Sequence, residues 1–184
     1  MANVRLLVMD YQNFVVPMCK ADDALGPLGR AIAGARAAGV GVFHINIGFR
    51  PDYPEINRKN PLMKGLVEAE ALRAPEVWLP HPVAAPVEGE AVVVKKRVSG
   101  FSGSDLDVLL RAQEVTDLVL AGIGTSGVVL ATMLDACDRD FAVTVLGDAC
   151  ADPDQEMHRM LVENLFPKRG AVSSADDWVA SLSA

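Results

Sequence analysis

Two charged residues that each follow an apolar run are the first candidates for chemistry. Asp10 follows the run Val4–Met9, and Lys95 follows the run Ala91–Val94. A carboxylate in apolar surroundings is costly to bury without a partner, and burial raises its pKa toward the range of a general acid or base. Lys95 is suited to pair with it and to hold a substrate oxygen. The structural alternatives are a capping aspartate and a solvated lysine.

A turn in the stretch Leu118–Asp135 is the third candidate. This stretch combines a short apolar run, two glycines, two hydroxyl residues and a long apolar segment, which predicts a strand, a tight turn and a helix. The hydroxyl residues Thr125 and Ser126 are good helix N-caps. Together with Ile123 and Gly124 they would present amides that favour an anion or a developing oxyanion. The alternative is an ordinary connection between a strand and a helix.

These segments resemble the motifs of the isochorismatase-like cysteine hydrolases, and they occur in the family's order. In that family the catalytic lysine lies four residues before a serine, which corresponds here to Ser99 and therefore to Lys95. The matching segments are Asp10-Tyr11-Gln12-Asn13, Lys95-Lys96-Arg97-Val98-Ser99-Gly100-Phe101, Gly103-Ser104-Asp105-Leu106, Gly124-Thr125-Ser126-Gly127-Val128-Val129 and Asp135-Ala136.

The resemblance implies a catalytic triad of which one member is missing. Asp10 and Lys95 match the family's aspartate and lysine, but the position of its nucleophilic cysteine holds Val128, which cannot form a thioester. The other cysteines are Cys19, Cys137 and Cys150, and the sequence does not place any of them at this position.

The family contains a precedent for the missing cysteine. Its isochorismatases keep the aspartate and the lysine and hydrolyse a vinyl ether by protonation and water capture. By this resemblance we expect a hydrolase of a small, anionic metabolite in which Asp10 and Lys95 assist water. The alternative is a non-catalytic descendant that binds a small molecule or a partner protein. The family also leads us to expect a cis peptide bond between Ile123 and Gly124.

Other polar residues add to the predicted site. Gln12 and Phe14 are predicted to line the pocket floor, and Arg50 to anchor an anionic substrate, with a solvated arginine as the alternative. Where the nicotinamidase branch of the family carries an Asp-x-His metal motif, this chain has Asn46-Ile47-Gly48. We therefore expect no metal site and no other cofactor.

Alternating strand and helix patterns predict an α/β fold. A three-layer sandwich would place a mostly parallel six-stranded sheet between helices, and the ends of its strands would bring Asp10, Lys95 and the Gly124 turn together. The strands are expected at Val4–Met9, Val40–Ile47, Ala91–Val94, Leu118–Ala121, Ala142–Leu146 and Ala171-Val172. The helices are expected from Asp22 to Ala38, at Asp105–Ala112, Val128–Cys137, Gln155–Phe166 and Ala175–Leu182, with a short one at Pro61–Glu68 in the proline-rich segment between Pro51 and Pro86.

Length and composition limit the class of protein. The chain has 184 residues, which suits one domain over residues 1–184. Its net charge of −7 argues against nucleic-acid binding, and it has no apolar run of the length that a membrane span needs. Three widely spaced cysteines and the absence of a secretory core predict a cytoplasmic protein. The apolar helix Val128–Cys137 predicts a homodimer or homotetramer.

Overall fold

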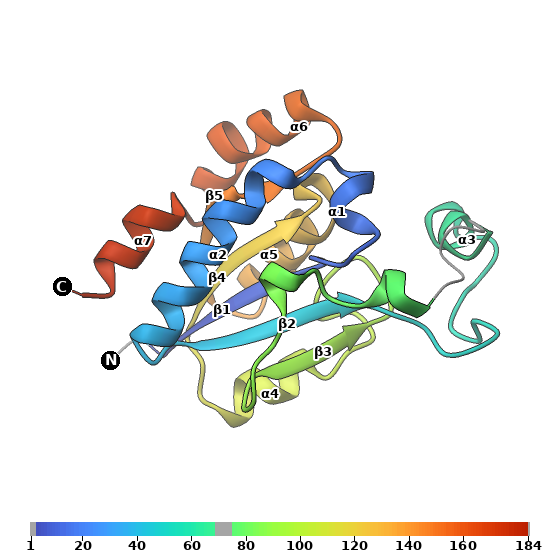
Figure 1. The fold of residues 1–184 in the computed structure, drawn as a ribbon, viewed down its shortest axis with the longest axis horizontal. Coiled ribbons are helices and arrows are strands. Elements are labelled where there is room, and N and C mark those ends of the chain that lie inside the picture. Colours follow the sequence, from blue (N-terminus) through green and yellow to red (C-terminus); the bar gives the residue numbers. More distant parts are fainter. Residues whose placement is uncertain (1–2, 69–74, 184) are drawn as a thin grey trace.

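Six apolar runs form one sheet in the computed structural model, which describes residues 3–68 and 75–183 (Figure 1). Every pairing between neighbouring strands is parallel, as predicted for this fold class. Such a sheet is covered on both faces, which explains why its strands are mainly apolar. The strands are β1 (Val4–Met9), β2 (Gly41–Ile47), β3 (Ala91–Lys95), β4 (Asp117–Ile123), β5 (Ala142–Ala151) and β6 (Ala171–Ser173).

The strand order is β3-β2-β1-β4-β5-β6, so the direction in which the chain adds strands reverses between β1 and β4. Crevices that bind ligands in open α/β sheets lie beyond the carboxyl ends of the strands at such a reversal. Asp10 directly follows β1, and Gly124 directly follows β4. The topology therefore brings two of the predicted site segments to the same edge of the sheet.

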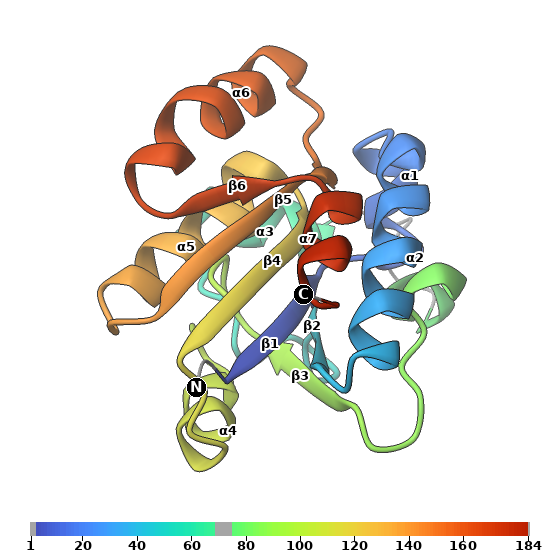
Figure 2. The ribbon, with the colours of Figure 1, turned by 90° about the vertical axis from the view of Figure 1, so that its left-hand side faces the viewer.

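Helices cover both faces of the sheet (Figure 2). On one face, helices α1 (Val15–Met18), α2 (Asp22–Ala37) and α7 (Ala175–Ser181) bury apolar residues in a shared core cluster. On the other, α4 (Leu106–Ala112) and α5 (Leu130–Cys137) contribute to a second cluster. The remaining helical segments are α3 (Pro61–Glu68), α6 (Gln155–Met160), η2 (Pro75–Trp78), η3 (Pro82–Ala84), η4 (Thr125–Val129), η5 (Leu161–Leu165) and η6 (Phe166–Lys168).

Several predicted boundaries are wrong, and the causes are local. Strand β5 continues past Gly147 and Asp148 to Ala151, because a register shift lets the chain stay paired with β4. Helix α1 was not predicted, since its four residues include a proline. Helix α2 begins at Asp22, as predicted, and ends one residue early, at Ala37.

Candidate active site

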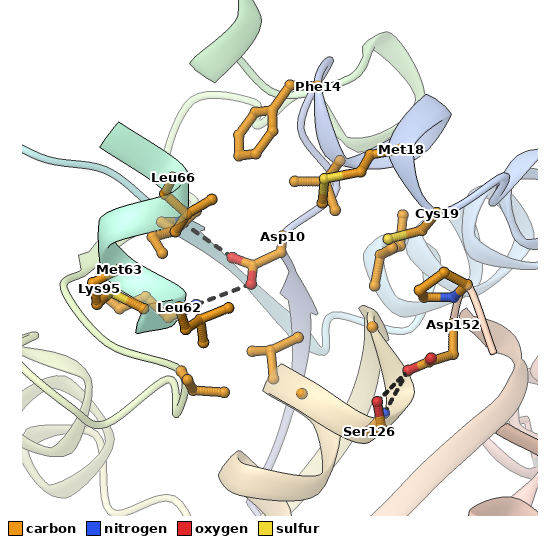
Figure 3. A pocket seen from close by; sticks show the side chains of 18 residues that line it. Asp10, Phe14, Met18, Cys19, Leu62, Met63, Leu66, Lys95, Ser126 and Asp152 are labelled. Carbon is orange, nitrogen blue, oxygen red and sulfur yellow. Dashed lines mark hydrogen bonds and ion pairs between the residues drawn. The ribbon is translucent and has the colours of Figure 1, made fainter. Parts of the chain in front are cut away.

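A pocket at the carboxyl ends of the strands collects most of the candidate residues (Figure 3). Its cavity volume is about 230 Å³, and apolar side chains form most of its wall. Helix α3, which lies to one side of the main body in Figure 1, contributes Leu62, Met63 and Leu66. The polar and charged lining side chains are Asp10, Cys19, Lys95, Ser126 and Asp152.

Asp10 and Lys95 form an ion pair in this pocket, as the sequence predicts. Lys95 Nζ lies 2.9 Å from Asp10 Oδ2, and the two side chains are only 1% and 10% exposed. Lys95 Nζ also donates to the carbonyl of Arg97, and Asp10 Oδ1 accepts from the amide of Ile47 at 3.1 Å. The pair is therefore held by the ends of three neighbouring strands, β1, β2 and β3.

Burial is the main influence on the acidity of Asp10. It raises the pKa of the Asp10 carboxyl above its usual value, while the charge and hydrogen bond of Lys95 and the Ile47 amide offset part of that rise. A carboxyl with a raised pKa keeps its proton to higher pH, and a general acid must be protonated before it can donate. The backbone at Asp10 is also left-handed, with φ of 56°.

The turn after β4 has the predicted cis peptide bond between Ile123 and Gly124. The helix that follows begins as the wide turn η4, with Gly124 rather than a hydroxyl residue as its N-cap. The Gly127 amide donates back to the carbonyl of Gly124 at 3.1 Å. Ile123, Gly124 and Ser126 line the pocket, as do Gly127 and Val128.

A buried carboxylate, Asp152, occupies the helix start that was predicted to hold an oxyanion. Asp152 Oδ2 accepts from both the amide and the hydroxyl of Ser126, each at 2.7 Å. The Ser126 amide is therefore already bonded to an anion of the chain itself. Sequence analysis missed Asp152 because it ended β5 at Leu146. With the full strand, Asp152 directly follows β5 in the same way as Asp10 directly follows β1.

Three residues predicted to bind substrate have other partners and do not line the pocket. The Gln12 amide is buried and bonds the backbone of Ile47 and Trp78, which ties the chain after β1 to its neighbours. Arg50 has a 72% exposed side chain paired with Glu55. Thr125 is fully buried, and its hydroxyl bonds His158 Nδ1 at 2.8 Å.

Two apolar residues from the prediction do reach the pocket. Val128 is 3% exposed and lines it together with Asp10 and Lys95. Phe14 forms part of the wall, where its ring packs against Trp78 with centroids 4.7 Å apart. Both present hydrocarbon to a ligand and offer no group that could react.

No cysteine takes the place of a thiolate nucleophile in the described residues. Cys19, which sequence analysis left unassigned, lines the pocket, but burial, reinforced by the charges of Asp152 and Asp10, raises its pKa to about 11. Cys150 lies within β5 rather than after it, and burial raises its pKa to about 12. Cys137 is on the last turn of α5 and does not line the pocket. Both buried thiols stay protonated at neutral pH, and a protonated thiol is a poor nucleophile.

Neither a metal-binding group nor a membrane span is found in the part of the chain that the structure describes. Within residues 3–68 and 75–183, no three His, Cys, Asp or Glu residues are grouped to hold a metal ion. Over the same residues, no helix has the length and apolar character needed to cross a membrane.

Comparison with known proteins gives one consistent family. The family model described as the isochorismatase domain matches residues 5–177. The isochorismatase family protein YecD of Escherichia coli O157:H7 is 29% identical over 184 residues, covering 96% of this chain and 95% of its own. The ureidoacrylate amidohydrolase RutB of Methylobacterium radiotolerans is 34% identical over 206 residues, covering 98% and 80%.

A solved structure gives the same result for the fold. The structure of an isochorismatase family protein from Burkholderia thailandensis superposes with a TM-score of 0.84 at 26% identity. It covers 99% of this chain and 96% of the other. The three-layer architecture predicted from the sequence is therefore the architecture of this family.

Proposed function

The chain belongs to the isochorismatase family, and on that premise we propose that it hydrolyses a small metabolite with water as the nucleophile, assisted by Asp10 and Lys95. The observation that carries the proposal is the buried ion pair at 2.9 Å inside the pocket. Its location supports a catalytic role because two charges are costly to bury where they only stabilise the fold. The similarity to an amidohydrolase supports hydrolysis of a small molecule.

In this proposal Asp10 donates and takes back a proton, and the ammonium of Lys95 stabilises the Asp10 carboxylate that forms in between. Protonated Asp10 donates its proton to the substrate, water adds to the carbon that becomes electron-poor, and the water's own proton returns to the Asp10 carboxylate. For a vinyl ether, the donated proton becomes part of a new C–H bond, the C–O bond to the departing group breaks, and the departing oxygen takes the second proton of the water. One water is thus consumed and Asp10 regains its proton. The raised pKa of Asp10 supports the donating step.

We assign the position of the family's nucleophilic cysteine to Val128, which makes a covalent intermediate at this position impossible. The pocket wall supports the assignment because Val128 lies in it beside Asp10 and Lys95. Phe14, Ile123, Gly124 and Ser126 complete the proposed binding surface. The predicted role of Arg50 is not carried over, because its guanidinium is paired with Glu55 outside this surface.

The test is turnover by the purified protein on isochorismate, aryl amides and carbamoyl compounds. On any substrate that it hydrolyses, Asp10→Asn should reduce kcat/KM by about 10²-fold or more, because the amide keeps the shape but cannot exchange the proton. Lys95→Met should also lower kcat/KM and should raise the pH at which activity is lost, since the lysine charge lowers the pKa of Asp10.

A matched control separates these effects from a general loss of negative charge. Asp23→Asn removes one exposed carboxylate from the first turn of α2 and should leave kcat/KM unchanged. Full activity in the Asp10→Asn variant would contradict the mechanism. A wild-type protein that turns over none of these compounds but binds some of them would instead support the non-catalytic descendant.

A further inference from the structure

Asp152 is a charged pocket residue that the proposed reaction does not use. It directly follows β5, is 2% exposed and forms part of the wall that also contains Phe14 and Met18. Its carboxylate lies against the turn after β4, because a Cβ placed on Gly124 would be 3.1 Å from Asp152 Oδ2. Figure 3 shows Asp152 and its bonds to Ser126 apart from the Asp10–Lys95 pair.

The hydrogen bonds of Asp152 fix its orientation without using all of its capacity. Oδ2 accepts from the amide and the hydroxyl of Ser126, and Oδ1 accepts from the amide of Asp154 at 3.1 Å. A carboxylate offers about four acceptor sites. The hydrogen bonds found for this side chain therefore use three of these acceptor sites and leave one of Oδ1 without a donor from the described residues.

The carboxylate of Asp152 has no ion-pair partner among the residues that the structure describes. The ammonium of Lys95 is paired with Asp10 at 2.9 Å and is therefore not bonded to Asp152. The titratable groups close to it do not supply a positive charge. Burial raises the pKa of the Cys19 thiol to about 11, and burial lowers the pKa of His158, although Asp152 acts to raise it.

The rest of the wall suits a compact apolar body. Phe14, Met18, Leu62, Leu66 and Val128 all present hydrocarbon to the cavity. Its volume of about 230 Å³ exceeds the roughly 150 Å³ of an apolar protein cavity that binds benzene, so a single ring with a short polar arm fits. A buried carboxylate without an ion-pair partner beside such a wall favours a ligand cation that brings its own charge and N–H donors.

We propose that Asp152 makes this pocket selective for a small apolar molecule that carries a protonated amine, and that it disfavours carboxylates. The inference concerns the substrate class of the proposed hydrolase and so rests on that function. It differs from the anionic substrate predicted from the sequence. The physical reason is that the helix start expected to bind an anion already holds the carboxylate of Asp152.

Three probes of nearly equal size and different charge test the preference. Benzylamine, benzyl alcohol and benzoate are titrated into the full chain at neutral pH and low ionic strength, and the heat of binding gives each Kd. Benzylamine should bind about tenfold more tightly than benzyl alcohol, because charge-assisted hydrogen bonds are stronger than neutral ones. Benzoate should bind most weakly, since like charges repel in a partly buried site.

The variant Asp152→Asn tests whether Asp152 is the residue that causes the preference for a cation. Asparagine has the same shape and an oxygen that still accepts from Ser126, so circular dichroism should show a folded protein. The variant should bind benzylamine about tenfold or more weakly than the wild type and should lose its discrimination against benzoate. Asp154→Asn is the matched control, because it removes the same charge at the exposed N-cap of α6, where asparagine caps equally well. It should leave the ranking unchanged.

Two results would overturn the proposal. One is a wild-type protein that binds benzoate as tightly as benzylamine, which decides the matter even if Asp152→Asn does not fold. The other is an Asp152→Asn variant that keeps the wild-type ranking. None of the three probes contains a bond to be hydrolysed, so the charge preference is measured independently of turnover. Failure of the proposed function is detected separately, by the activity of Asp10→Asn.

Discussion

Asp10 and Val128 are the two pocket residues on which our proposed chemistry depends. Asp10 is a buried acid whose pKa is raised by burial and held in check by Lys95. Val128 contributes only volume, at a position that we assign to the family's nucleophile. A pocket with an acid and no nucleophile is suited to reactions in which water attacks a protonated substrate, which distinguishes it from a thiol amidase.

Val128→Cys should create a reactive thiol. A cysteine here would lie at the start of a helix and in the same wall as Lys95, and both features lower a thiol pKa. We therefore expect faster alkylation by iodoacetamide than in the wild type, together with weak amidase or esterase activity. The measurement is the rate of mass increase at neutral pH.

The wild-type protein provides the background rate for this experiment. Burial raises the pKa values of Cys19 and Cys150 to about 11 and about 12, so both should react slowly. Burial also raises the pKa of Cys137, but this thiol is only partly buried, so we expect it to account for the remaining labelling. A Val128→Cys protein that is alkylated no faster than the wild type would show that the turn is not shaped as a nucleophile site.

At the scale of elements, the polar cluster of Arg36, His44 and Glu90 joins helix α2 to strands β2 and β3. Glu90 accepts from Arg36 at 2.8 Å and 2.9 Å and lies 2.8 Å from His44 Nε2. Burial acts to raise the pKa of Glu90, but the hydrogen bonds from Arg36, Val87 and His44 prevail and lower it to about 2. The cluster thus links the helix layer to the sheet, and none of its three residues lines the pocket.

Glu90→Gln should lower the free energy of unfolding and should make that free energy depend less on pH. The folded pKa of Glu90 is below its ordinary value of 4.5, so its stabilising effect is complete above pH 4.5 and is lost as the pH falls toward about 2. Urea unfolding should therefore show a wild-type advantage near pH 7 that shrinks across this range. Glu88→Gln, at an exposed neighbouring position, is the control and should follow the wild type. An advantage that does not change between pH 7 and pH 2 would contradict the assignment.

At the scale of the whole molecule, the sheet and its two helix layers position the pocket. The carboxyl ends of β1, β2, β3 and β4 meet at one edge, and the end of β5 adds Asp152. Both core clusters pack on this one sheet, and the family model matches residues 5–177. These observations support our proposal of a single domain over residues 1–184. The cytoplasmic location stays a prediction.

The predicted homodimer or homotetramer is tested by the mass in solution. Apolar side chains remain exposed on the edge strand β3, at Val92 and Val94, and on helix α5, at Leu134. Their burial between subunits would be favourable. Light scattering should give two or four times the chain mass of 19.6 kDa. A mass near 19.6 kDa at micromolar concentration would contradict the prediction.

The sequence by itself determined the sheet and the two charged residues at the ends of β1 and β3. Apolar runs broken by charged or glycine residues are local patterns, and parallel strands place their carboxyl ends at one edge by geometry. This was enough to predict that Asp10 and Lys95 meet and that the Gly124 turn reaches the same edge. The motif resemblance added the cis bond and the family.

Only the tertiary structure decided which polar groups remain available to a ligand. Gln12, Arg50 and Thr125 have the right chemistry, but their hydrogen-bonding groups are used by partners distant in the sequence or by a nearby glutamate. Asp152 reached the pocket because β5 is longer than its apolar run suggests. The bonding of a polar side chain depends on every group that folding brings within about 3 Å of it, and this information is not local in the sequence.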